Sequence, residues 1–124
     1  MAAWTPDELE KIGGAEEVRI APLRGDGTLR NPVTIWIVRV DDDLYVRSAY
    51  GRSAAWFRGG QMRREGRIQG GGIEKDVLFT DADHRLNDEI DAGYRAKYQR
   101  QGAQYVNMMV NPEARIATIK LTPR

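Results

Sequence analysis

The sequence contains no cysteine and only one histidine. Without cysteine, the chain cannot form disulfide bonds, thiolate nucleophiles or cysteine-rich zinc sites. His84 has no partner at a metal-ligand spacing such as H-x-x-x-H, and the chain has no serine elbow. We therefore expect no metal centre, and we interpret His84 as a surface or capping residue at the start of a helix.

The sequence also lacks an excess of charge of one sign and lacks long apolar runs. The chain has 19 lysines and arginines against 18 aspartates and glutamates, which leaves a net charge of +1. Such a balance gives no global attraction to nucleic acid or to a membrane. No apolar run approaches the roughly 18 residues that span a bilayer, and the opening MAAWTPDELEK lacks the apolar segment of a signal peptide. We expect a cytoplasmic protein without nucleic-acid or membrane partners.

The composition is otherwise that of an ordinary globular protein, with 124 residues of which 41% are hydrophobic. A chain of this length is expected to form one domain, residues 1–124, and to bury a core without covalent staples.

Two segments are predicted to be helical. In WTPDELEKIGG, residues 4–14, Thr5 is a suitable N-cap and Glu8 completes a capping box. In residues 83–102, apolar side chains recur on one face of a helix. This second helix also carries acidic residues that we interpret as a solvated face, namely Asp88, Glu89 and Asp91.

Alternating apolar and β-branched residues predict several strands joined by tight turns. Residues 54–66 are ambiguous and can form a helical turn. Gly70–Gly72 indicate a bulge or a barrel bend. Together these elements predict an α+β fold, mainly antiparallel β, with a barrel or strongly curved sheet flanked by helices. The expected strands are 16–23, 33–40, 44–50, two short strands around Gly70–Gly72, and 114–123.

A basic segment with glycine and aromatic residues follows the central hairpin. Arginine offers a fork of donors to phosphate, serine adds a hydroxyl, and glycine lets the backbone approach closely. The alternative is a solvated strand end whose arginines pair with the carboxylates at 41–43 or with Glu65. The candidate anion-binding residues are Arg47, Ser48, Gly51, Arg52 and Arg58, and the candidate stacking residues beside them are Tyr50 and Trp56.

Other candidate residues have simpler interpretations. Trp36 and Tyr45 are expected in the barrel core. The run 63–67, RREGR, is interpreted as a solvated turn, since no aromatic residues interleave with its charges. Lys97 either faces a ligand or remains in solvent while the tyrosines on both sides of it pack, and the sequence leaves both possibilities open.

The stretch RNPVTIWIVRVDDDLYVRSAYG, residues 30–51, resembles the core hairpin of small split β-barrel proteins around the deazaflavin-dependent nitroreductases. WFRGG, residues 56–60, resembles the WyrN segment of that superfamily. Nearly the whole chain also resembles a family of unknown function, with its opening WT-x-x-EL, central IW-x-V…LYVRS-x-x-G and late D-x-x-Y-x-x-KY.

This resemblance implies a split β-barrel, commonly a homodimer, that binds FMN or the deazaflavin F420 near its basic rim. It implies phosphate contacts at Ser48 and Gly51 and an aromatic contact at Trp56. One hypothesis is therefore an oxidoreductase that uses this cofactor for hydride chemistry on an unknown substrate. The other is a non-enzymatic module that binds a small ligand or a partner. Two departures favour the second: GTLRNP stands where the superfamily has GR-x-SG, and Gly59 replaces an asparagine.

Overall fold

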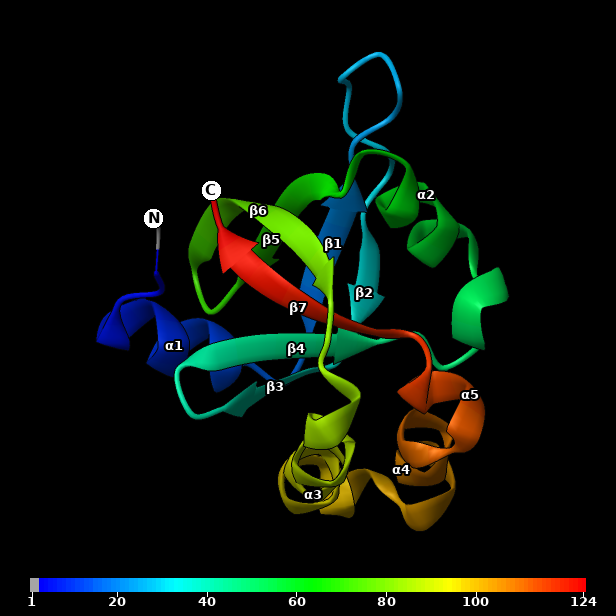
Figure 1. Ribbon diagram of the computed structural model, residues 1–124. Helices are drawn as coiled ribbons and strands as arrows, with labels where there is room; N and C mark the ends of the chain where they lie inside the picture. Colours follow the sequence, from blue (N-terminus) through cyan, green and yellow to red (C-terminus); the bar gives the residue numbers. More distant parts are fainter. Residues whose placement is uncertain (1–2) are drawn as a thin grey trace.

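The computed structural model describes residues 3–124, and its centre is a seven-stranded antiparallel sheet. The strands run in the spatial order β2-β1-β5-β6-β7-β4-β3, and the sheet curls into a nearly closed barrel (Figure 1). This confirms the predicted α+β, mainly antiparallel split barrel. The strands are β1 (Val18–Pro22), β2 (Val33–Ile35), β3 (Ile37–Val40), β4 (Asp43–Arg47), β5 (Glu65–Gly70), β6 (Ile73–Asp81) and β7 (Thr118–Pro123).

Helices flank the barrel on several sides (Figure 1). The ambiguous segment after the central hairpin forms one of them, α2, which packs against β1. The α-helices of the described residues are α1 (Pro6–Gly13), α2 (Ala55–Arg63), α3 (Asn87–Tyr98), α4 (Ala103–Val110) and α5 (Pro112–Arg115). Short 3-10 turns precede or follow them at η1 (Gly51–Ser53), η2 (His84–Leu86) and η3 (Gln99–Gln101).

The strand predicted over residues 33–40 is broken at Trp36. Val33–Ile35 pairs with β1 at one edge of the sheet, whereas Ile37–Val40 pairs with β4 at the other edge. One continuous straight strand cannot pair at both edges of a curved sheet, so the expectation of a single strand is wrong. The chain instead passes from one edge to the other through a single residue.

The first helix confirms the capping box. The Thr5 hydroxyl accepts a hydrogen bond from the Glu8 N–H at 3.1 Å, and the Glu8 carboxylate accepts one from the Thr5 N–H at 2.9 Å. Ile12 is fully buried, and the Trp4 indole donates to the Leu121 carbonyl of β7 at 2.9 Å. These contacts fasten α1 to the barrel.

The second predicted helix is confirmed as three successive pieces, η2, α3 and η3. The Asp83 carboxylate caps its start, and Gly102, with φ of +109°, ends it. The next helix, α4, was not predicted. The expected final strand 114–123 begins later, at Thr118, because Asn111 and Pro112 start α5 in front of it.

The three consecutive glycines connect β5 to β6, and the expectation of a bulge or bend is wrong. Gly70 pairs with Ile73, which leaves Gly71 and Gly72 as the two central residues of a hairpin turn. Their φ angles are +57° and +83°, the left-handed values that such a turn requires.

Two hydrophobic cores hold these elements together. The first fills the barrel and includes Ile20, Ile68 and Phe79. The second lies between the outer surface of β3 and β4 and the helices α3 and α4, and it includes Tyr45 and Tyr94. Within residues 3–124, no helix is both long and apolar enough to cross a membrane.

Candidate functional site

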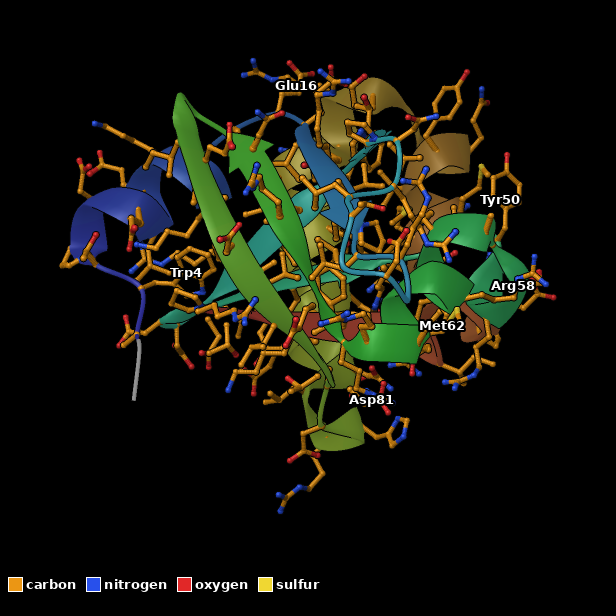
Figure 2. The ribbon with its side chains drawn as sticks, turned by 90° about the horizontal axis from the view of Figure 1, so that it is seen from above. Trp4, Glu16, Tyr50, Arg58, Met62 and Asp81 are labelled. Carbon is orange, nitrogen blue, oxygen red and sulfur yellow. The ribbon has the colours of Figure 1, made fainter. Side chains whose placement is uncertain are left out.

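A hollow of about 320 Å³ lies between the edge strand β2, the start of α2 and helix α4. The lining is mostly apolar and rich in aromatic and methionine side chains. Figure 2 shows Tyr50 and Arg58 at the outer edge of the molecule beside α2. The lining residues are Val33, Thr34, Ile35, Trp36, Arg47, Ala49, Tyr50, Trp56, Tyr105, Met108 and Met109.

Trp36 forms one aromatic wall of this pocket. It is only partly buried, so its assignment to the barrel core is wrong. Its ring stacks on Tyr98 of α3, with 4.0 Å between centroids and 2° between planes. Trp56 forms a second wall and packs edge-on against the buried Phe57 at 6.0 Å. Tyr50 is 71% exposed at the mouth of the pocket.

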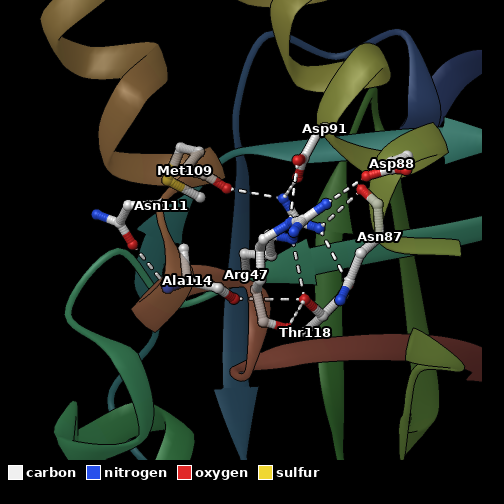
Figure 3. A network of polar contacts seen from close by, with 9 residues as sticks. Arg47, Asn87, Asp88, Asp91, Met109, Asn111, Ala114 and Thr118 are labelled. Carbon is white, nitrogen blue, oxygen red and sulfur yellow. Dashed lines mark hydrogen bonds and ion pairs between the residues drawn. The ribbon is translucent and has the colours of Figure 1, made fainter. Parts of the chain in front are cut away.

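Arg47 lines the pocket but its guanidinium is turned into the protein (Figure 3). Its Nε donates to the Thr118 hydroxyl at 2.9 Å. One Nη donates to Asp91 and, at 2.9 Å, to the Met109 carbonyl. The other Nη donates to the carbonyl and the side-chain oxygen of Asn87, both at 3.3 Å. These five acceptors occupy all five N–H donors of an arginine.

The assignment of Arg47 as an anion-binding residue is therefore corrected. Its partner is Asp91, not the carboxylates at 41–43 or Glu65, and Asp91 also pairs with Arg115 at 3.1 Å. With every donor engaged, Arg47 holds β4, α3, α4 and β7 together beneath the pocket.

Gly51 and Arg52 face α5 instead of the pocket. Gly51 has φ of +69°, and a Cβ placed there would lie 3.4 Å from the Glu113 Cβ. The Arg52 guanidinium donates to the Ile116 carbonyl at 3.3 Å and lies 5.2 Å from the centre of the Phe57 ring. The close approach of η1 to α5 accounts for the glycine without a ligand.

Two predicted residues keep free polar groups. The Ser48 hydroxyl is buried and has no hydrogen-bond partner among residues 3–124. Arg58 is exposed on α2, and no hydrogen bond or ion pair engages its side chain within the same part of the chain. A buried hydroxyl without a partner is uncommon in folded proteins and requires an explanation.

Residues 8–121 match the family model DUF2255, described as an uncharacterized protein conserved in bacteria. This chain belongs to the DUF2255 family. No curated protein matches the sequence.

The DUF2255 chain is similar in fold to several solved structures. The heme storage protein HutZ from Vibrio cholerae has 11% identity and a TM-score of 0.61, with 89% of this chain and 82% of that chain covered. A FAD-binding protein from Mesorhizobium loti has 16% identity and a TM-score of 0.56, over 98% and 91% of the chains. An F420 reductase has 12% identity and a TM-score of 0.54, over 97% and 96%. At these identities the similarity establishes the split-barrel fold.

Several residues that line the pocket of this DUF2255 protein were not predicted from the sequence. Tyr105, Met108 and Met109 come from α4, a helix that was not predicted, although AQYVNMMV has apolar residues at helical spacing. The residues from β2 were expected within one long strand over 33–40, and not as a separate edge strand beside a pocket.

The Lys97 ammonium lies 5.0 Å from the centre of the Tyr98 ring, which also stacks on Trp36. This ammonium donates to the Gly13 carbonyl at 2.8 Å and to the Ile37 carbonyl at 2.7 Å. The Tyr98 hydroxyl also donates to the Glu16 carbonyl at 2.7 Å. Of the two roles that the sequence left open for Lys97, the structure shows neither, because the side chain links backbone segments.

Replacing Lys97 with methionine tests the effect of its burial. Burial lowers the pKa of Lys97 to about 8. Between pH 8 and pH 10 the unfolded chain, whose lysine has an ordinary pKa, then binds more protons than the folded protein. The free energy of unfolding therefore increases as the pH rises through this range. The neutral amine keeps two N–H donors for its two carbonyls. We expect the native protein to gain stability relative to Lys97→Met over this range, as measured by urea unfolding at each pH. A pH-independent difference between the two proteins would contradict this.

Proposed function

We propose that this protein binds the ring system of a flavin or deazaflavin nucleotide, FMN or F420, in the aromatic pocket, and acts as an oxidoreductase. The observation that carries the proposal is the pocket itself. It is apolar, measures about 320 Å³ and has Trp36 and Trp56 in its lining. Pockets of about 300 Å³ or more, with few polar groups, are typical of small-molecule sites. This volume suits a planar ring system, with the rest of a nucleotide outside.

The donor set favours a flavin over heme, which HutZ stores. Heme iron is held by histidine, cysteine, methionine or tyrosine. The chain has no cysteine, and its one histidine, His84, is exposed in η2 and does not line the pocket. A heme iron would therefore have to be held by a tyrosine or methionine of the lining alone, without the histidine or cysteine that most heme proteins use. A flavin needs no ligand of that kind and is held by stacking and hydrogen bonds.

The phosphate of the nucleotide would lie near Ser48 and Arg58. The buried Ser48 hydroxyl has no partner among residues 3–124, and Arg58 is the predicted anion-binding arginine whose side chain is free there. Arg47 and Arg52 would not contact the phosphate, because their side chains are hydrogen-bonded to Thr118 and Ile116 inside the protein.

The bound ring would supply hydride transfer, and the chain would supply position and shelter. Trp36, held by its stack on Tyr98, and Trp56, held by Phe57, would fix the plane of the ring. Tyr50 at the mouth would exclude water. No side chain is assigned as catalytic, and a homodimer remains a prediction.

Titration of the purified protein with FMN and with F420, followed by quenching of tryptophan fluorescence, tests this function. We expect micromolar binding that Trp56→Leu weakens about five- to tenfold, because the lost stacking surface is worth on the order of 1–1.5 kcal/mol. Ile116→Ala is the matched control, since Ile116 is 53% exposed and lies outside the pocket lining. Absence of binding to either cofactor overturns the proposal.

Comparison of FMN with riboflavin, which lacks the phosphate, tests the role of Arg58. We expect Arg58→Gln to weaken FMN binding about tenfold and to leave riboflavin binding unchanged, because a charge-assisted hydrogen bond to phosphate is lost. Equal weakening of both ligands would place the phosphate elsewhere.

A second candidate function is a non-enzymatic module that binds a small apolar ligand in the same pocket. It is favoured by the internal contacts of Arg47, Gly51 and Arg52, which leave few donors for a phosphate. Under this alternative, an apolar ring compound without phosphate quenches the pocket tryptophans while FMN and F420 do not.

A further inference from the structure

A second hollow, of about 160 Å³, lies on the outer face of the sheet where β1 and β5 meet the loop before β2. It shares no lining residue with the aromatic pocket. Ala21, Leu29 and Pro32 give it an apolar floor. Its charged lining residues are three arginines and one glutamate, namely Arg19, Arg30, Arg67 and Glu74.

The glutamate is already engaged. One Glu74 oxygen lies 3.1 Å from an Nη of Arg67, and the other accepts a hydrogen bond from Gln69 at 2.7 Å. Arg67 also donates to Asp76 at 2.9 Å. Two carboxylates therefore neutralise Arg67, and the other two arginines of the hollow are left without one.

Arg19 and Arg30 form no ion pair with any carboxylate in residues 3–124. The Nε of Arg30 is buried and has no acceptor there. Its Nη2 lies 3.7 Å from the thioether sulfur of Met62, a weak acceptor. Burying a charged donor without a partner costs free energy. Other contacts must therefore hold the Arg30 side chain in this position.

Gly59 of α2 makes room for Arg30. A Cβ at position 59 would lie 2.7 Å from the Arg30 Nε and 3.2 Å from its Cζ. The backbone N–H of Arg30 donates to the Pro22 carbonyl at 2.9 Å, which fixes the loop above β1. Gly59 and the GTLRNP stretch that contains Arg30 are the two departures from the superfamily pattern, and the two lie in contact here.

We propose that this hollow binds a phosphoryl group, with Arg30 and Arg19 donating to its oxygens. The guanidinium fork matches the geometry of phosphate oxygens, and two unpaired arginines leave an excess of positive charge over an apolar floor. The hollow is too small for a nucleotide and suits a single phosphoryl group. That group is either free phosphate or the end of a phosphate monoester. Phosphate binding in this hollow does not require a ligand in the aromatic pocket, because the two hollows share no lining residue.

The test is a titration followed by ¹H–¹⁵N NMR spectra that include the arginine Nε–Hε signals. The probes are inorganic phosphate and glycerol 3-phosphate, each compared with chloride at the same ionic strength. We expect a saturable shift of the Arg30 Nε–Hε signal with phosphate and not with chloride. A shift with both probes assigns the site to a terminal phosphoryl group, and a shift with inorganic phosphate alone assigns it to the free ion. No saturable shift, or an equal shift with chloride, overturns the proposal.

Two variants locate the binding. Arg30→Gln removes the donor, and Gly59→Ala keeps the arginine but pushes the flexible end of its side chain aside. Each is expected to weaken phosphate binding about tenfold or more, read from the backbone amide shifts of Arg19 and Leu29. Arg95→Gln on α3 removes the same charge at a residue outside the lining of the hollow and is expected to have no effect. Equal weakening by all three variants would indicate only non-specific electrostatic attraction of phosphate to the protein and would overturn the site.

Discussion

Replacing Arg47 with methionine is expected to lower the free energy of unfolding by about 3–5 kcal/mol, because it leaves Asp91 buried without its main partner. The Arg47 side chain is fully buried, and Asp91 is only 7% exposed. The Arg47 guanidinium also donates to the Met109 carbonyl and the Thr118 hydroxyl, which lose this donor in the variant. Arg115 still contacts Asp91 at 3.1 Å, so the loss is expected at the lower end of this range.

Urea unfolding followed by circular dichroism measures this change. The matched control is Arg52→Met, five residues further along, where an exposed guanidinium makes one hydrogen bond to the Ile116 carbonyl. That control is expected to lose about 1 kcal/mol or less. A second check is the double variant Arg47→Met with Asp91→Leu, which should be more stable than Arg47→Met alone because no buried charge is left unpaired. Equal losses for Arg47→Met and Arg52→Met would show that the buried network contributes little.

Replacing Gly71 with alanine is expected to cost about 3 kcal/mol. Gly71 has φ of +57°, which strains any residue with a Cβ by about 1–2 kcal/mol. A Cβ there would also lie 2.1 Å from the Lys11 carbonyl oxygen of α1. The backbone cannot swing aside as a side chain can, so either the hairpin or α1 must shift, at a cost of about 1–3 kcal/mol.

The adjacent Gly72 provides the control. It has φ of +83°, and nothing lies within 4 Å of a Cβ placed there. Gly72→Ala is therefore expected to lose only the strain of about 1–2 kcal/mol. The difference between the two variants in thermal or urea unfolding isolates the contact with α1. If both lose the same amount, the hairpin does not rest on that helix.

Local chemistry predicted the elements that depend on neighbouring residues. The capping box of Thr5 and Glu8, the cap at Asp83 and the end at Gly102 are formed by residues close in the sequence, and each was read correctly. The barrel followed from strand patterning together with the resemblance of its central hairpin.

The sequence could not reveal contacts between distant residues. Asp91 was interpreted as part of a solvated acidic face, since its side chain follows Asp88 and Glu89 on one helix. It is the partner of Arg47, 44 residues away. Periodicity shows which face of a helix is polar, but not that a buried arginine from a strand meets that face. For the same reason the basic segment 47–58 contributes only Arg58 as an arginine whose side chain has no partner among residues 3–124.

Trp36 shows a different limit. Its neighbours on both sides are β-branched or apolar, so local preference favours one uninterrupted strand. The break arises from the closure of the sheet, a property of all seven strands together, and the stacking of Trp36 on Tyr98 is made possible by that break.

The place of β7 in the sheet has a consequence for the order in which the fold assembles. This strand is the last of the seven along the chain, yet it lies in the interior of the sheet between β6 and β4. Before it is available, the β3–β4 hairpin and the group of β2, β1, β5 and β6 are two separate sheets, tethered through Trp36 and the segment that follows β4. Each of the two exposes an unpaired edge, on β4 and on β6, of the kind that promotes association between chains. During synthesis on the ribosome the nascent chain therefore carries two open edges in addition to those on β2 and β3, and one late strand closes both.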